Sequence, residues 1–323
     1  KVGENSKPKL DKMRKAKSIP KLNTNQETKI KPIEVNGKLY YVLNLIGVGG
    51  FSKVYQVYDP SVQMTYALKV VDLSKAEESA KLGLKNEIKL LERLKHCKRV
   101  VRLIDHELVL EKNQMILVME KGDSDLGSVL KQFIETDNST YLDLILLKHY
   151  WKEMLKAVSE IHKLGIVHSD LKPVNFISVG GKLKLIDFGI ANAIQSDHTS
   201  VIKDHQVGTI NYMAPEALCS RSDLDPSGGQ SGKPYIKFNC KADVWSLGCI
   251  LYNLAYGRPP FAHFQNLYSK LKAICDPKVE VNYPPHENPF VIDCLKVNWP
   301  LVIYFLFYFS IKVQTYKTLL GDI

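Results

Sequence analysis

The first part of the chain alternates apolar runs of strand length with polar and glycine-containing breaks. Residues 40–46 and 54–58 are apolar runs on either side of a glycine-rich stretch, a pattern that predicts a β-hairpin. Residues 66–71 and 115–119 are further apolar runs of strand length. The pattern therefore predicts a hairpin followed by additional strands.

The predicted strand at residues 66–71 contains one charged side chain, Lys69. A lysine in an apolar strand is costly to bury unless it is paired, so the sequence should also supply a carboxylate. The candidate is Glu87, because apolar residues follow it at helical spacing over 88–94 and place it beside the buried face. We expect Glu87 to hold Lys69 in place; the alternative is a solvated surface acid like Glu92.

Two polar motifs carry the candidate chemistry. One is His-x-Asp-x-x-x-x-Asn at 168–175, and the other is an Asp-Phe-Gly that begins at Asp187. Asn175 and Asp187 are candidate metal ligands, because Mg²⁺ prefers carboxylate and amide oxygens. Asp170 is the candidate acceptor of a substrate hydroxyl proton, and Lys172 can neutralise the transferring group. Each residue alone is also common in turns, but the set in this order indicates phosphoryl transfer from ATP.

The glycine-rich stretch supplies the second half of such a site. Gly47, Gly49 and Gly50 lie where backbone N–H groups of a hairpin can close over phosphates. A hairpin of this kind is also compatible with a plain tight turn. Ser52 replaces the third glycine of the usual pattern, which narrows backbone freedom there.

Residues 40–296 resemble a eukaryotic protein kinase domain. The motifs above are followed in the family's order by Gly-Thr-Ile-Asn-Tyr-Met-Ala-Pro-Glu at 208–216 and Asp-Val-Trp-Ser-Leu-Gly at 243–248. Four less common features are together similar to the monopolar spindle (TTK-type) spindle-checkpoint kinases: the glycine loop with Ser52, His-Ser-Asp at 168–170, Ile-Asp-Phe-Gly-Ile-Ala-Asn at 186–192, and Val-Gly-Thr-Ile-Asn-Tyr-Met at 207–213.

The resemblance implies an α+β, two-lobed protein kinase fold, in which a small antiparallel β-sheet N-lobe has one main helix and the C-lobe is mainly helical. It also implies four segments: a basic disordered tail (1–38), the N-lobe and hinge (39–122), a C-lobe that is incomplete at its end (123–296) and an atypical apolar tail (297–323). ATP and Mg²⁺ are the implied cofactors, with Lys69 on the α- and β-phosphates.

An apolar strand that ends at a glycine-containing connector can present backbone groups to a purine edge. By analogy with the family, residues 120–122 are the hinge and Met119 guards the back pocket. Asp125 either reaches the ribose or caps the next helix. The expected nucleotide contacts are Gly47, Val48, Gly49, Gly50, Val54, Ala67, Lys69, Glu87, Met119, Glu120, Gly122 and Asp187.

The resemblance also implies an activity and a setting. Thr209 and Lys172 are marks of Ser/Thr kinases, and dual-specificity autophosphorylation that includes Tyr is a trait of the TTK-type family. Members act in the spindle assembly checkpoint on kinetochore proteins. We therefore expect kinetochore and checkpoint proteins as substrates, and a location in the nucleus, the cytoplasm and the mitotic kinetochore.

Ser169 changes how such an enzyme would be activated. Many kinases have an arginine here that clamps a phosphate on the activation loop, and serine cannot form that bidentate pair. Activation must then use other contacts. The loop offers Thr199 and Ser200, and the resemblance suggests Thr199 as an autophosphorylation site; the alternative is an unmodified loop. With Thr209, these are the regulatory candidates.

The net charge of +10 is concentrated at the start of the chain. Residues 1–38 hold eleven Lys and Arg against four Asp and Glu, a net charge of +7. This segment is typical of a disordered basic tail, for which an acidic partner and a plain solvated linker are alternatives. The six cysteines include no C-x-x-C pair, so free thiols are expected. The sequence does not indicate an oligomeric state.

After Lys296 the sequence departs from the family. No arginine follows Arg258, although the family ends on one that pairs with the position of Glu216. We expect an unpaired buried carboxylate there and a weakened large lobe. The apolar run at 299–311 is shorter than the roughly 18 to 20 residues that span a bilayer, so no membrane span is expected. Two interpretations of this apolar run remain: a remodelled helix or strand that packs into the large lobe, and an alternative chain end. The alternative to an active enzyme is a nucleotide-binding scaffold with little activity.

Overall fold

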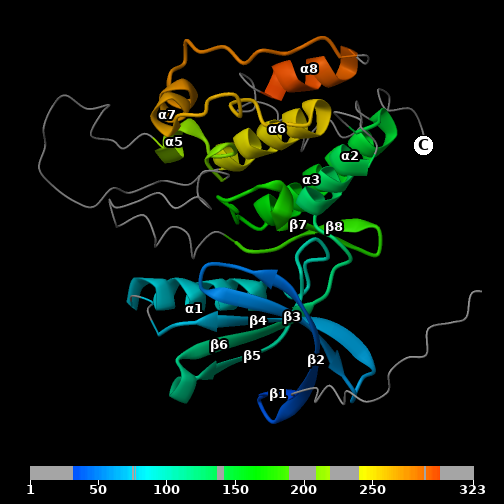
Figure 1. Cartoon of the computed structure of the whole chain (residues 1–323), viewed down its shortest axis with the longest axis vertical. Coiled ribbons are helices and arrows are strands. Elements are labelled where there is room, and N and C mark those ends of the chain that lie inside the picture. Colours follow the sequence, from blue (N-terminus) through cyan, green and yellow to red (C-terminus); the bar gives the residue numbers. More distant parts are fainter. Residues whose placement is uncertain are drawn as a thin grey trace, which may run out of the picture.

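The computed structural model describes residues 32–74, 76, 78–136, 142–188, 209–218, 240–286 and 289–298. These residues form two lobes, with a sheet and one helix in the first and most of the helices in the second (Figure 1). The expected α+β two-lobed fold is therefore confirmed. Three expected features lie outside the described residues: the tail at 1–31, Thr199 with Ser200, and the apolar run at 299–311.

The N-lobe is a six-stranded antiparallel sheet in the order β1-β2-β3-β4-β6-β5. Its strands are β1 (Pro32–Val35), β2 (Lys38–Val48), β3 (Ser52–Asp59), β4 (Met64–Asp72), β5 (Leu103–Val109) and β6 (Gln114–Glu120), with the short turn η1 (Leu110–Lys112) before β6. Helix α1 (Glu78–Arg93) packs Leu84 and Ile88 against Met115 and Leu117 of β6. Burial of this apolar face fixes the helix on the sheet.

Strand β1 lies inside the segment that the sequence assigned to the basic tail. Its residues pair with β2, and Val35 is completely buried. Asn36 and Gly37 have φ angles of 48° and 78°, the geometry of the two-residue hairpin turns that Asn-Gly favours. The expected boundary at residue 38 therefore falls within the sheet, and the Asn-Gly turn was the signal that would have placed it earlier.

The C-lobe surrounds one large apolar core. Its elements are α2 (Leu126–Thr136), α3 (Leu144–Lys163), η2 (Pro173–Asn175), β7 (Phe176–Val179), β8 (Lys182–Leu185), α5 (Pro215–Leu218), α6 (Cys240–Tyr256), α7 (Leu267–Cys275) and α8 (Pro289–Asn298). The hairpin β7–β8 lies on the side of this lobe that faces the N-lobe (Figure 1). The loop before this hairpin carries the residues of the first catalytic motif.

Helix α6 is buried around most of its circumference, which is typical of a core helix. Asp243, in its first turn, is completely buried. Because a buried carboxylate is costly without hydrogen-bond donors, the surrounding chain must supply them. This requirement links α6 to the catalytic loop.

Helix α8 closes the described part of the C-lobe. Val291 and Leu295 are buried in the same core as α3 and α6. Glu216, in α5, is exposed. The expectation of a buried unpaired carboxylate that weakens the large lobe is therefore wrong for Glu216, because solvent reaches the side chain.

Five of the six cysteines lie in the described residues, and all five are free thiols, as expected: Cys97, Cys240, Cys249, Cys275 and Cys294. Among the helices that the structure describes, none combines the length and the hydropathy needed to cross a bilayer.

Candidate active site

A buried carboxylate on α6 holds the catalytic loop. Asp243 accepts hydrogen bonds from the backbone N–H groups of His168 and Ser169, both at 2.8 Å, and lies 2.8 Å from His162 Nε2. Ser169 has a φ of 69°, a left-handed conformation that is costly for a non-glycine residue and persists where the surroundings fix it. Asp243 supplies that restraint, so α6 positions the residues that follow Ser169.

The ring of His168 connects the two catalytic motifs. Its Nε2 lies 3.0 Å from the carbonyl oxygen of Ile186, and the Asp170 N–H lies 3.4 Å from its Nδ1. Because a carbonyl only accepts, Nε2 carries the ring proton and Nδ1 accepts from Asp170. The ring also packs on Phe188, with 4.9 Å between centroids. His168 thereby fixes the position of Asp170 relative to Asp187.

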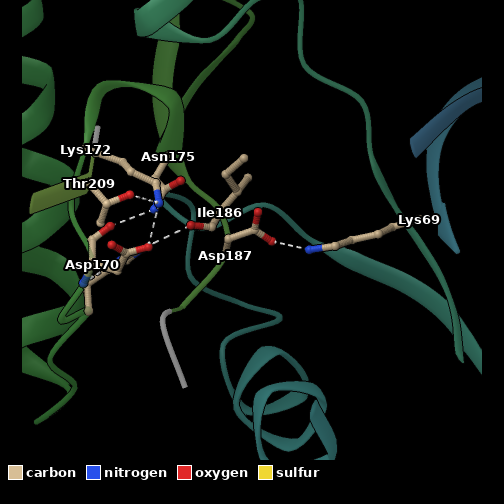
Figure 2. Close-up of polar contacts among 8 residues, drawn as sticks. Lys69, Asp170, Lys172, Asn175, Ile186, Asp187 and Thr209 are labelled. Carbon is tan, nitrogen blue, oxygen red and sulfur yellow. Dashed lines mark hydrogen bonds and ion pairs between the residues drawn. The ribbon is translucent and has the colours of Figure 1, made fainter. Parts of the chain in front are cut away.

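Asp170, Lys172 and Thr209 form one polar cluster (Figure 2). Lys172 Nζ lies 2.9 Å from Asp170 Oδ2 and donates to Thr209 Oγ1 at 3.3 Å. A carboxylate beside an ammonium and a hydroxyl can orient a substrate hydroxyl and accept its proton. The structure thus brings Thr209, predicted as a regulatory residue, into contact with the predicted catalytic lysine.

Asn175 and Asp187 have the oxygens that a magnesium ion needs. Asn175 Nδ2 donates to the backbone oxygen of Asp170 at 2.7 Å, which leaves Oδ1 as the end of the amide for a ligand. The Asp187 side chain is 49 % exposed. Within the described ranges, no group of three or more His, Cys, Asp and Glu could hold a metal. One carboxylate and one amide fit Mg²⁺, which keeps several waters and binds substrate phosphates.

Lys69 contacts Asp187 rather than Glu87. Its Nζ lies 2.6 Å from Asp187 Oδ1 (Figure 2). Burial disfavours the Lys69 ammonium, but the two carboxylates outweigh burial and raise its pKa. Neighbouring protein atoms partly desolvate the Asp187 carboxylate and oppose its ionisation, but Lys69 outweighs this effect and lowers the pKa of that carboxyl. The expected Lys69–Glu87 contact is therefore not formed, because the Asp187 carboxylate holds the lysine.

Glu87 is only 6 % exposed and makes no hydrogen bond or ion pair with any residue that the structure describes. Burial raises the pKa of Glu87 to about 7, from an ordinary value of 4.5. Between pH 4.5 and about pH 7, Glu87 keeps its proton in the folded protein but has released it in the unfolded chain. The free energy of unfolding should then fall as the pH rises from about 4.5 through about 7.

We expect a Glu87→Gln variant to lack this pH-dependent loss, because glutamine does not titrate. Relative to the wild type, the variant should gain up to about 3 kcal/mol of stability between pH 5 and pH 8. Urea denaturation of both proteins at the two pH values measures the difference. The same pH dependence in both proteins would contradict a buried, protonated Glu87.

The glycine-rich hairpin and the strands beyond it share one face of the N-lobe sheet. The register pairs Gly47 with Val54, Val54 with Lys69, and Ala67 with Met119. Paired residues, and residues two apart on a strand, point to the same side of a sheet. These five predicted contacts therefore lie on the face from which Lys69 reaches Asp187.

The turn of the hairpin differs in one respect from the prediction. The Gly49 N–H donates to the backbone oxygen of Ser52 at 2.7 Å and closes the expected turn. Val48 pairs with Lys53, and its side chain is 70 % exposed. The structure therefore does not bring the Val48 side chain onto the face that carries Lys69. Gly50 lies in the open part of the turn, with nothing within 4 Å of an added Cβ.

The predicted hinge connects β6 to the C-lobe. Lys184 Nζ donates to both carboxylate oxygens of Glu120, at 2.8 and 2.6 Å, so β8 holds the Glu120 side chain. No described group accepts from the Gly122 N–H, which leaves this donor for a purine edge. Asp125 caps α2 by accepting from the N–H and the hydroxyl of Ser128, which selects one of its two expected roles.

Gly122 lies too close to β7 for a side chain. An added Cβ would be 2.5 Å from Ile177 Cγ2 and 2.9 Å from the backbone oxygen of Ser178. Since backbone atoms cannot rotate away, we expect Gly122→Ala to lower the free energy of unfolding by about 1–3 kcal/mol. Gly50→Ala is the matched control and should change it by less than about 0.5 kcal/mol. Urea denaturation distinguishes the two, and equal losses would contradict the steric argument.

Two residues of the site were not among the sequence-based site candidates. Asp243 entered the sequence analysis only as the first residue of the family motif at 243–248. Lys184 gave no signal, because alternation of Lys and Leu in β8 is typical of any half-exposed strand. Thr199 and Ser200 lie outside the described residues and stay predictions.

Comparisons with known proteins agree with this geometry. A family model described as "Protein kinase domain" matches residues 40–299. "Probable serine/threonine-protein kinase mps1" of Dictyostelium discoideum is 45 % identical over 265 residues, which are 81 % of this chain and 26 % of that protein. "Dual specificity protein kinase TTK" of Mus musculus is 46 % identical over 265 residues, 82 % of this chain and 29 % of that protein.

A third relative, "Serine/threonine-protein kinase MPS1" of Saccharomyces cerevisiae, is 42 % identical over 256 residues, 79 % of this chain and 32 % of that protein. The chain thus spans about a quarter to a third of the length of these relatives.

Proposed function

The chain belongs to the protein kinase family, and we propose that it transfers the γ-phosphoryl group of ATP to Ser and Thr side chains of proteins. The observation that carries the proposal is the convergence of Lys69, Asp170 and Asp187 from both lobes (Figure 2). Lys69 lies 2.6 Å from Asp187, and His168 connects the segment that leads into Asp187 to the Asp170 loop.

Each side chain has a role in the proposed reaction. Bound Mg²⁺ supplies positive charge to the phosphate oxygens, and Asn175 and Asp187 are the residues that would hold it. Asp170 orients the substrate hydroxyl and accepts its proton, while Lys172 stays beside the transferring group. Lys69 would exchange Asp187 for phosphate oxygens and for Glu87, which lies buried nearby.

The nucleotide would lie under the face that carries Gly47, Val54, Ala67, Lys69 and Met119. Its purine edge would accept from the Gly122 N–H, next to Glu120 in the hinge. The loop of Gly49 and Gly50 would close over the phosphates, with Val48 contributing backbone only. These assignments, like the boundary between the lobes after residue 122, belong to the proposal.

The finer proposal is a kinase of the spindle-checkpoint type. It rests on 42–46 % identity to relatives named MPS1 and TTK, one of them described as a dual specificity kinase. On this proposal the chain phosphorylates kinetochore and checkpoint proteins, with Tyr as a further acceptor. It would act in the nucleus, the cytoplasm and the mitotic kinetochore, and the basic N-terminal segment would bind an acidic partner.

We also assign regulation to the segment before α5. Thr209 Oγ1 accepts from Lys172, so a phosphate on Thr209 would place negative charge beside the catalytic lysine. Thr199 and Ser200 are proposed as further phosphorylation sites. Ser169 cannot clamp such a phosphate as an arginine would.

A nucleotide-binding scaffold without activity is not favoured. The full set of catalytic side chains is present, and α8 contributes buried residues to the C-lobe core. A nucleotide-binding scaffold would not need these catalytic side chains. The two proposals are separable by turnover.

The test uses the purified chain with MgATP and a generic basic protein substrate. We expect phosphoserine and phosphothreonine in the substrate, and EDTA should abolish both because Asp187 and Asn175 cannot align phosphates alone. Asp187→Asn is the inactive control. Phosphate incorporation no higher than that of the control would overturn the enzyme proposal, and thermal stabilisation by MgATP without turnover would support the scaffold.

A further inference from the structure

The exposed side of α1 and the turn after it carry an excess of positive charge. Residues 81–102 contain eight Lys and Arg but only two acids, Glu87 and Glu92. Glu87 is buried on the opposite side of the helix. Six of the eight cations are exposed, and we call them the basic face: Lys85, Lys89, Arg93, Lys95, Lys98 and Arg102. None makes an ion pair with a described residue.

The cations on the helix form a regular row. Lys81, Lys85, Lys89 and Arg93 follow one another at four-residue spacing, so each lies next to a like charge. Like charges at this spacing destabilise a helix. Only Lys81 has a compensating contact, with Glu78 at 2.7 Å. The row therefore opposes helix stability, and the other side of α1 must offset it.

The other side of α1 is well anchored. Leu84, Ile88 and Leu91 are buried, the first two against β6. Figure 1 shows α1 lying along the sheet. Because Leu84 and Ile88 pack against β6, the exposed cations of the row lie on the side of the helix that faces away from the sheet. The helix backbone that carries the row is already ordered, so little backbone freedom is lost when an anionic partner binds to it.

We propose that the basic face binds an acidic, extended segment of a partner protein. Successive cations on the row are separated by about 6 Å of helix rise. Alternate side chains of an extended chain are about 6.7 Å apart and share one side, so alternating Asp or Glu residues match Lys85, Lys89 and Arg93. Leu82 is 60 % exposed at the start of the row and offers an apolar contact to such a segment.

The same features disfavour nucleic acid and membrane as the occupant. Single-stranded nucleic acid is held by aromatic side chains that stack on bases, and residues 81–102 contain no Phe, Tyr or Trp. A membrane-binding helix pairs its cations with a broad apolar face, and here Leu82 is the only exposed large apolar side chain on α1 in the described residues. A protein segment fits one apolar contact and a short row of charges.

The test measures binding to the full chain without ATP, so that its outcome is independent of kinase activity. The probe is a fluorescein-labelled peptide with glutamates at alternate positions around one leucine. Its binding is measured by fluorescence anisotropy at 50 mM salt. We expect the wild type to bind it. Combined Lys85→Glu, Lys89→Glu and Arg93→Glu changes should weaken binding at least tenfold, from about three lost ion pairs.

The matched control carries Lys152→Glu, Lys182→Glu and Lys278→Glu, three exposed C-lobe lysines, and changes the net charge equally. It should bind within about threefold of the wild type, since the changes are remote. Circular dichroism of each variant checks that weaker binding is not caused by unfolding. A single Lys89→Gln change, which removes one charge without reversing it, should also weaken binding in a folded protein. Equal weakening in both triple variants would overturn the proposal. So would a single-stranded RNA or phosphatidylserine vesicles that bind through the same three residues more tightly than the peptide.

Discussion

Replacing Asp170 with asparagine is expected to lower kcat by about 10²- to 10⁴-fold, with little change in the affinity for ATP. Asparagine has nearly the shape of aspartate and keeps an oxygen for Lys172, which lies 2.9 Å from Asp170 Oδ2. It cannot accept a proton at neutral pH. The change therefore removes proton acceptance and leaves the phosphate-aligning residues, Lys69 and Asp187, in place.

Steady-state kinetics with MgATP and a generic basic substrate measure this effect as a split between kcat and KM. Asp143→Asn is the matched control, because Asp143 caps α3 away from the site and asparagine caps helices equally well. A kcat for Asp170→Asn within tenfold of the wild type would contradict the assignment of Asp170 as the proton acceptor.

The residue types of this site could be predicted from the sequence, but one central contact could not. Local motifs fixed the chemistry of Asp170, Asn175 and Asp187, because phosphoryl transfer needs those groups at that spacing. The choice between the two carboxylates depends on how α1, which carries Glu87, and the loop that carries Asp187 are placed around Lys69. Both segments are distant from Lys69 in sequence or separated from it by other elements, so local motifs do not determine the contact. In the structure the exposed Asp187 holds the ammonium, and Glu87 stays buried and unpaired among the described residues.

The direction of the Val48 side chain shows a second limit. Strand periodicity assigns faces by counting residues, and the pairing of β2 with β3 has irregularities between Val42 and Asn44 and between Leu45 and Gly47. Each irregularity shifts the count, so the face of the last strand residues cannot be read from alternation alone. The strand β1, by contrast, was predictable from the Asn-Gly turn that precedes β2.

Asp243→Asn is expected to be the most damaging single change outside the catalytic groups themselves. Both Asp243 oxygens are used: one accepts from the His168 N–H and faces His162, and the other accepts from the Ser169 N–H. An amide replaces one oxygen with an NH₂ group, which would face a buried donor. We expect the free energy of unfolding to fall by at least about 3 kcal/mol.

The same variant should lose kcat even at temperatures where it is folded. Ser169 keeps its left-handed φ of 69° only under restraint, so a loosened Ser169 would displace the adjacent Asp170. His162→Gln is the comparison, because it changes one contact of Asp243 and leaves both backbone hydrogen bonds. It should cost about 1 kcal/mol and little kcat. Urea denaturation and kinetics of both variants separate the two effects, and an Asp243→Asn protein that is less stable but fully active would show that α6 supports the fold without positioning the catalytic loop.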